Sequence, residues 1–133
     1  MVEKRITDGR RIAELLSSEL DGRTDDELRR MAVANVDDAV EATADGGRAY
    51  DVERDGERFA RVFVHPDRVR LEFDSGREAA VEAATDLELR TRPKASQPPK
   101  TLVFVESGAE VKRATDVVQA ASRALEDEER SSR

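Results

Sequence analysis

The residue types that carry out chemistry are scarce in this 133-residue chain. It contains no Cys and a single histidine, His65. The absence of Cys excludes thiolate catalysis, Cys-based zinc sites and iron–sulfur clusters. A single histidine also excludes sites that need two imidazoles, such as the zinc motif H-E-x-x-H. A site that uses a histidine would have to combine His65 with carboxylates, which are abundant in this chain.

His65 lies in the sequence His65-Pro66-Asp67-Arg68, which predicts a tight turn because Pro occupies a position that type I turns prefer. We expect an ordinary, exposed turn histidine. A histidine that acts as a general base needs an orienting carboxylate, for which Asp67 is a candidate, and the sequence identifies no nucleophile. We therefore predict no catalytic residue. A small hydrolase or metal-dependent enzyme that uses carboxylates with His65 remains the alternative.

The run Asp51-x-Glu53-x-Asp55-Gly56 resembles the start of a calcium-binding loop. The twelfth position of such a loop needs a bidentate Glu, and this chain has Val62 there. Alternating strand residues around a hairpin explain the run better. We predict no metal site and no cofactor, although so acidic a chain leaves a carboxylate-only metal site open.

The most unusual segment runs from residue 90 to residue 100. It carries three of the four Pro residues of the chain and four positive charges, on Arg90, Arg92, Lys94 and Lys100. Acidic residues are absent from Leu89 through Val105. A basic connector stiffened by Pro is suited to present its cations to an anion, to RNA or to an acidic protein surface. The alternative is a surface loop whose cations pair with carboxylates of the chain itself. The segment contains no aromatic residue, so the base stacking typical of single-strand binding is missing.

Acidic residues outnumber basic ones, with 30 Asp and Glu against 23 Lys and Arg and a net charge of −7. Lys is rare, since all but four of the basic residues are Arg. This composition predicts a halophilic protein whose charge mainly keeps it soluble. Binding to a phosphate backbone weakens steeply with salt, so nucleic-acid binding is disfavoured. We expect a cytoplasmic protein, because no apolar stretch approaches a membrane span or the core of a signal peptide.

The elements that must position these residues follow from the hydrophobic pattern. Ile12, Leu15, Leu16 and Leu20 form one stripe of a helix that begins after Asp8 and ends at Gly22. A capping box at Thr24–Glu27 predicts a second short helix reaching Val36. Residues 37–47 are small and acidic, which predicts a loop.

Period-two alternation then predicts three antiparallel strands over residues 48–54, 57–65 and 69–74, joined by Asp55-Gly56 and by the Pro66 turn. A capping box at Ser75–Glu78 predicts a helix to about Asp86, followed by strands at 87–92 and 101–105. A third box at Ser107–Glu110 begins a last helix. The predicted fold class is α+β, with two N-terminal helices, an antiparallel sheet of about five strands (a three-strand meander plus two) and two further helices packed on the sheet. Residues 1–125 form the predicted single domain, and residues 126–133 a charged, frayed tail.

Residues 1–23 and the run Pro99-Lys100-Thr101-Leu102-Val103-Phe104-Val105-Glu106-Ser107-Gly108-Ala109-Glu110-Val111-Lys112-Arg113-Ala114 resemble a small haloarchaeal protein family known only as hypothetical. The resemblance covers most of the chain but contains no catalytic motif, so it implies no activity and no cofactor. It agrees with the halophilic composition.

Because the sequence offers no nucleophile–base pair, it favours a non-enzymatic binding or interaction module. The predicted contact surface is the basic segment with Arg90, Arg92, Lys94 and Lys100, and the predicted partner is a protein or another anionic molecule. A nucleic-acid-binding domain is the second alternative after the hydrolase. A homodimer is left open, and no membrane contact is expected.

Overall fold

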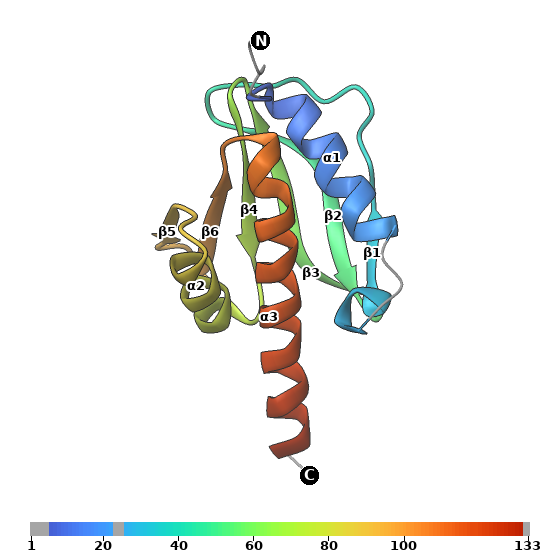
Figure 1. Cartoon of the computed structure of the whole chain (residues 1–133), viewed down its shortest axis with the longest axis vertical. Coiled ribbons are helices and arrows are strands. Elements are labelled where there is room, and N and C mark those ends of the chain that lie inside the picture. Colours follow the sequence, from blue (N-terminus) through green and yellow to red (C-terminus); the bar gives the residue numbers. More distant parts are fainter. Residues whose placement is uncertain (1–5, 23–25, 132–133) are drawn as a thin grey trace.

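A computed structural model describes residues 6–22 and 26–131 of the chain. A six-stranded antiparallel sheet in the order β1-β2-β3-β4-β6-β5 forms one layer, and three α-helices pack in front of it (Figure 1). The helices are α1 (Gly9–Gly22), α2 (Arg77–Asp86) and α3 (Val111–Ser131). The strands are β1 (Met31–Ala34), β2 (Gly47–Arg54), β3 (Glu57–His65), β4 (Arg68–Phe73), β5 (Thr91–Lys94) and β6 (Lys100–Val105). The predicted α+β class is confirmed.

The β2–β3 hairpin forms where the sequence predicts it. Arg54 pairs with Glu57, which leaves Asp55 and Gly56 as a two-residue turn with φ angles of 51° and 85°. These positive angles match the twist of the flanking strands and explain the Asp-Gly sequence. The next turn, at Pro66-Asp67, connects β3 to β4 with His65 paired opposite Arg68.

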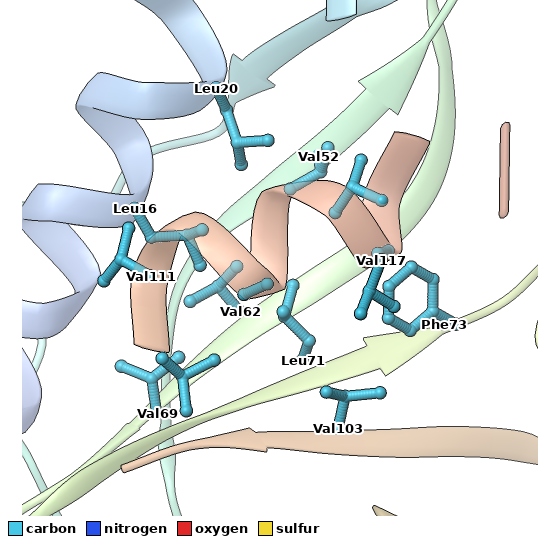
Figure 2. Packing of buried hydrophobic residues seen from close by; sticks show 14 of the residues in the cluster. Leu16, Leu20, Val52, Val62, Val69, Leu71, Phe73, Val103, Val111 and Val117 are labelled. Atoms are coloured by element: carbon cyan, nitrogen blue, oxygen red, sulfur yellow. The ribbon is translucent and has the colours of Figure 1, made fainter. Parts of the chain in front are cut away.

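The core lies between the sheet and the helices (Figure 2). Alternate residues of β4, namely Val69, Leu71 and Phe73, point toward the helices and are fully buried. Leu16 of α1 and Val117 of α3 meet them from above, also without exposed surface. Each such side chain contributes about 1.5–3 kcal/mol through burial, so this single layer of contacts holds the helices on one face of the sheet.

The predicted second N-terminal helix is wrong. Residues Asp26–Arg30 form a 3-10 turn, η1, and Met31–Ala34 form the edge strand β1 paired with β2. Val33 lies opposite Val52, so pairing with a distant strand overrides the weak local helix pattern. Val36, which the helix would have buried, is 55% exposed. The described residues therefore hold three α-helices and six strands, rather than four helices and about five strands.

One strand boundary also differs from the prediction. The strand expected at 87–92 begins only at Thr91, because Leu87 and Glu88 complete the end of α2 and Glu88 adopts a φ of 61°. The last helix extends beyond Leu125 to Ser131. Glu126 and Glu129 of this extension pair with Arg30 and Arg54, which ties the charged end of α3 to the rest of the molecule.

The capping chemistry is confirmed in part. The Asp8 carboxylate accepts a hydrogen bond from the Arg11 N–H at 3.2 Å, as an N-cap does. At α2, Gly76 adopts a left-handed conformation and no side chain caps the helix. At the third box the Glu110 carboxylate accepts a hydrogen bond from the N–H of Glu106 at 2.7 Å, while the buried Ser107 hydroxyl has no partner among the described residues. The box at Thr24 lies outside the described residues.

No helix in the described part of the chain is long and apolar enough to span a membrane.

Candidate binding face of the sheet

The sheet face turned away from the helices, here called the open face, is strongly basic. Side chains alternate between the two faces of a strand, so the residues between the core positions point to this side. The strand register places on it eight cations: Arg48, Arg58, Arg61, Arg68, Arg70, Arg92, Lys94 and Lys100. Only three carboxylates share these strand positions: Asp51, Glu53 and Glu72. A chain with a net charge of −7 thus carries a positive excess on one face.

A row of alternating Arg and Phe residues crosses this face. Arg48 lies opposite Phe63, Phe63 opposite Arg70, and Arg70 opposite Phe104. The Phe104 N–H donates to the carbonyl oxygen of Arg90, which completes the row at the edge of the sheet. We call Arg48, Phe63, Arg70, Phe104 and Arg90 the Arg–Phe row. It runs perpendicular to the strands and joins one residue each from β2, β3, β4 and β6 with Arg90, which precedes β5.

Guanidinium groups cover both aromatic rings of the row. The Arg70 guanidinium lies 4.4 Å from the centre of the Phe63 ring. Those of Arg90 and Arg68 lie 5.3 and 5.8 Å from the centre of the Phe104 ring. A cation over an aromatic face is attracted by the ring quadrupole, so the open face presents a stacked layer of flat groups.

Two carboxylates hold several of the cations in place. The buried Glu72 carboxylate lies 2.9 Å from the nearest guanidinium nitrogen of Arg70 and 3.4 Å from Lys94 Nζ. Asp74, just after β4, accepts from Lys100 and Arg58 at 2.8 Å each. Burial raises the pKa of the Asp74 carboxyl, but the hydrogen bonds and charges of Lys100 and Arg58 outweigh burial and set that pKa below its ordinary value. These pairs order the face and neutralise part of its charge.

Two arginines of the open face keep their charge unpaired. Arg61 is half-buried at the centre of the sheet, between Asp51 and Glu72 in the register, and its Nε is buried without a hydrogen-bond partner. Arg92 is exposed on the edge strand β5. Neither forms an ion pair with any residue that the structure describes. They are the cations of this face that are available to an anion without breaking an existing pair.

The basic segment predicted from the sequence forms the edge of this face. Three of its four cations pair with carboxylates of the chain itself: Arg90 with Glu106, Lys94 with Glu72, and Lys100 with Asp74. Arg92 is the exception among the described residues. The structure thus brings all four cations to one edge, with Lys94 opposite Lys100, and leaves one of them free.

His65 is buried, with 2% of its surface exposed, so the predicted exposed turn histidine is wrong. Ala44 and Gly46 of the loop before β2 pack against its ring, a long-range contact that the local turn sequence does not predict. Its Nδ1 lies 3.0 Å from the Ala44 carbonyl oxygen, and its Nε2 lies 3.1 Å from Arg70 Nη1. An arginine can only donate, so Nε2 accepts and Nδ1 carries the proton of a neutral imidazole. With both nitrogens engaged, His65 positions Arg70 and has no free lone pair to act as a general base.

Burial lowers the pKa of His65 most, the charges of Arg68 and Arg70 lower it further, and the Ala44 hydrogen bond and the charge of Asp67 raise it only in part. The unfolded chain therefore binds the histidine proton more readily than the folded chain. The stability that neutral His65 contributes is fully present above about pH 6.5 and is lost as the pH falls through the lower pKa of the folded state. We expect the free energy of unfolding in urea to fall more steeply between pH 7 and pH 5 in the wild type than in His65→Gln. Equal slopes in the two proteins would contradict this assignment.

His65 lines none of three cavities that the described residues form. One of about 320 Å³ opens between α1 and residues 36–40, lined by Arg10, Glu14, Asp37 and Tyr50 among others. Another lies between the start of α2 and α3. No group of three or more His, Asp or Glu side chains among the described residues is arranged to hold a metal ion. The alternative of a carboxylate and His65 enzyme therefore gains no support from the geometry.

The fold and this face together define a two-layer α+β protein, with helices on one side of an antiparallel sheet and a basic, aromatic-bearing surface on the other. The chain belongs to the family of unknown function DUF7993, whose model matches residues 1–133. Neither the curated proteins nor the solved structures give a significant match.

Proposed function

We propose that this protein is a non-enzymatic binding module that contacts an anionic partner through the open face, including its basic edge at Arg90, Arg92, Lys94 and Lys100. The observation that carries the proposal is the segregation of charge. Eight cations and three carboxylates point from the strands of this face, although the whole chain has a net charge of −7. Clustered cations raise the local concentration of anions and speed their association.

Arg61 and Arg92 are the centre of the proposed contact. An arginine binds carboxylate or phosphate through two parallel hydrogen bonds, and both residues lack a carboxylate partner among the described residues. The register aligns them in one cross-strand row with Glu72 and Leu102 between them. A polyanion lying across the sheet meets one free guanidinium near the middle and another at the edge.

The composition supports a setting of high salt in a halophilic cytoplasm, and we include this setting in the proposal. At molar salt the Debye length falls to about 3 Å, so attraction at long range is screened and contact pairs carry the binding. Guanidinium groups held by Glu72 and Asp74 remain oriented at such salt concentrations, because short, partly buried pairs are screened less than exposed ones.

Binding to inorganic polyphosphate, measured by calorimetry over a range of KCl concentrations, tests the proposal. We expect the wild type to bind and the double variant Arg61→Gln/Arg92→Gln to bind about tenfold more weakly, with the slope of log K against log salt reduced by about two. The matched control is Arg77→Gln/Lys112→Gln, which removes two exposed cations from α2 and α3.

The control is expected to bind polyphosphate as the wild type does. A wild type that fails to bind polyphosphate at low salt would overturn the proposal. Equal losses in the two double variants would show that general charge, and not the open face, governs binding.

A further inference from the structure

We infer that the anionic partner of the open face is a single-stranded nucleic acid whose bases stack along the Arg–Phe row. This inference rests on the proposed function and names the class of its partner. It starts from the alternation of Arg48, Phe63, Arg70, Phe104 and Arg90 across neighbouring strands. With strands about 4.8 Å apart, the row is about 19 Å long, which is enough for several nucleotides.

The aromatic rings favour a nucleic acid over an acidic protein. A chain of carboxylates needs cations alone and gains nothing from Phe63 and Phe104. Nucleic acid bases stack both on aromatic rings and on guanidinium planes, whatever their sequence. The row offers both kinds of surface side by side, with Arg70 directly opposite both rings.

The two rings differ in how their covering arginines are held. Arg70 above Phe63 is fixed by Glu72, by the Asp45 carbonyl oxygen and by His65 Nε2, so its plane is a rigid platform. Arg90 above Phe104 pairs with Glu106, and its side chain is 67% exposed. If Arg90 moved from the ring to a phosphate, Arg68 alone would remain over the Phe104 ring, and the side that Arg90 covers would be open to a base.

The free cations lie where the backbone of a stacked strand would run. Arg61 is two residues from Phe63 along β3, and Arg92 is two residues from Arg90 at β5. Two residues of a strand span about 7 Å, so the cross-strand row that begins at Arg61 and ends at Arg92, with Glu72 and Leu102 between them, lies beside the stacking row. A single strand whose bases stack on the Arg–Phe row would therefore place phosphates near Arg61 and Arg92.

The shape of the face favours a single strand over a duplex. Reading a duplex groove requires a projecting helix or a two-stranded ribbon. The described helices lie on the opposite side of the sheet (Figure 1), and the open face presents the side chains of paired strands. A flat stacking surface meets bases only where they are unpaired.

Fluorescence anisotropy with labelled oligonucleotides of about 12 nucleotides tests the inference, using single-stranded RNA, single-stranded DNA, their duplexes and, as competitor, inorganic polyphosphate. We expect tighter binding of single strands than of duplexes, and the RNA and DNA arms identify which backbone is preferred. The variant Phe63→Leu/Phe104→Leu keeps apolar volume but removes both π faces. We expect it to bind single strands about tenfold more weakly and polyphosphate as the wild type does. Its melting temperature checks that it folds.

A second variant leaves the rings in place, because Phe104 is only 7% exposed. Arg90→Lys keeps the charge of an exposed residue but removes its flat group, and the matched control Arg77→Lys does the same at an exposed arginine of α2, away from the open face. We expect oligonucleotide affinity to fall about threefold in Arg90→Lys and to keep its wild-type value in Arg77→Lys, and we expect Arg90→Lys to lose less affinity for polyphosphate than for the oligonucleotide. If all variants bind single strands as the wild type does while polyphosphate binds, or if duplexes bind more tightly, the inference fails and the proposed anion-binding function stands. If polyphosphate does not bind either, both fail.

Discussion

Replacing Gly9 with Ala is expected to lower the free energy of unfolding by about 3 kcal/mol. Gly9 begins α1 and packs directly on the β3–β4 turn, where its N–H donates to the Pro66 carbonyl oxygen at 3.2 Å. A Cβ added at this position would overlap the His65 carbonyl oxygen and lie 2.7 Å from that of Arg68. Both are backbone atoms of the turn, so the helix or the turn must shift to make room.

Urea unfolding of Gly9→Ala at pH 7 measures this effect, with the adjacent exposed Arg10→Ala as the control. We expect the control to change the free energy of unfolding by less than about 0.5 kcal/mol. An equally small change in Gly9→Ala would contradict the tight packing of α1 on the turn. The same turn holds His65 and Arg68, which lie opposite each other in the register. The variant therefore also tests whether the packing of α1 on this turn stabilises that end of the open face.

Replacing Leu71 with Ala is expected to cost about 3 kcal/mol of folding stability. Leu71 is fully buried at the centre of the sheet, opposite Val62 on β3 and Val103 on β6. Its side chain points up toward α3 (Figure 2), so truncation leaves a cavity beneath the helix that the surrounding sheet cannot close. Arg70 and Glu72, its neighbours in β4, point to the open face.

The control for Leu71→Ala is Val81→Ala, an aliphatic truncation on α2 at a residue that is 39% exposed. We expect it to cost less than about 1 kcal/mol. Thermal unfolding followed by circular dichroism distinguishes the two variants. Similar melting temperatures would show that β4 is not the central strand of the core.

The sequence predicts the elements that depend on neighbouring residues alone, namely the strands joined by tight turns and the first helix. The alternation in residues 48–74 and the Asp55-Gly56 turn identified three strands, because neighbouring strands joined by tight turns need only local information. The stripe of Ile12 and Leu16 identified α1 for the same reason. The sequence predicts a helix through residues 31–34, because four residues carry too little periodicity to indicate a strand that forms only by pairing with β2.

The candidate face was harder to predict, since it arises from long-range pairing. Phe104 and Phe63 are far apart in the sequence and become neighbours of Arg70 only through the strand order β3-β4-β6. The basic segment contains no aromatic residue, but the strand order places the Phe104 ring beside it. The sequence contains one signal for this face, which is the alternation of side chains along each strand. Phe63 and Phe104 fall between the core positions of their strands, where a solvent-exposed sheet face usually carries polar residues.

Nuclear magnetic resonance of the side-chain Nε–Hε groups of arginine tests the central claim most directly, because it reports on each guanidinium separately. Polyphosphate, and then a single-stranded oligonucleotide, would be added to labelled protein at about 0.1 M KCl. We predict the largest shifts at Arg61 and Arg92, with Arg70 and Arg90 following for the oligonucleotide, and none at Arg77 of α2. Shifts concentrated at Arg10 beside the cavity under α1, or spread evenly over helix and sheet arginines, would contradict a binding site on the open face.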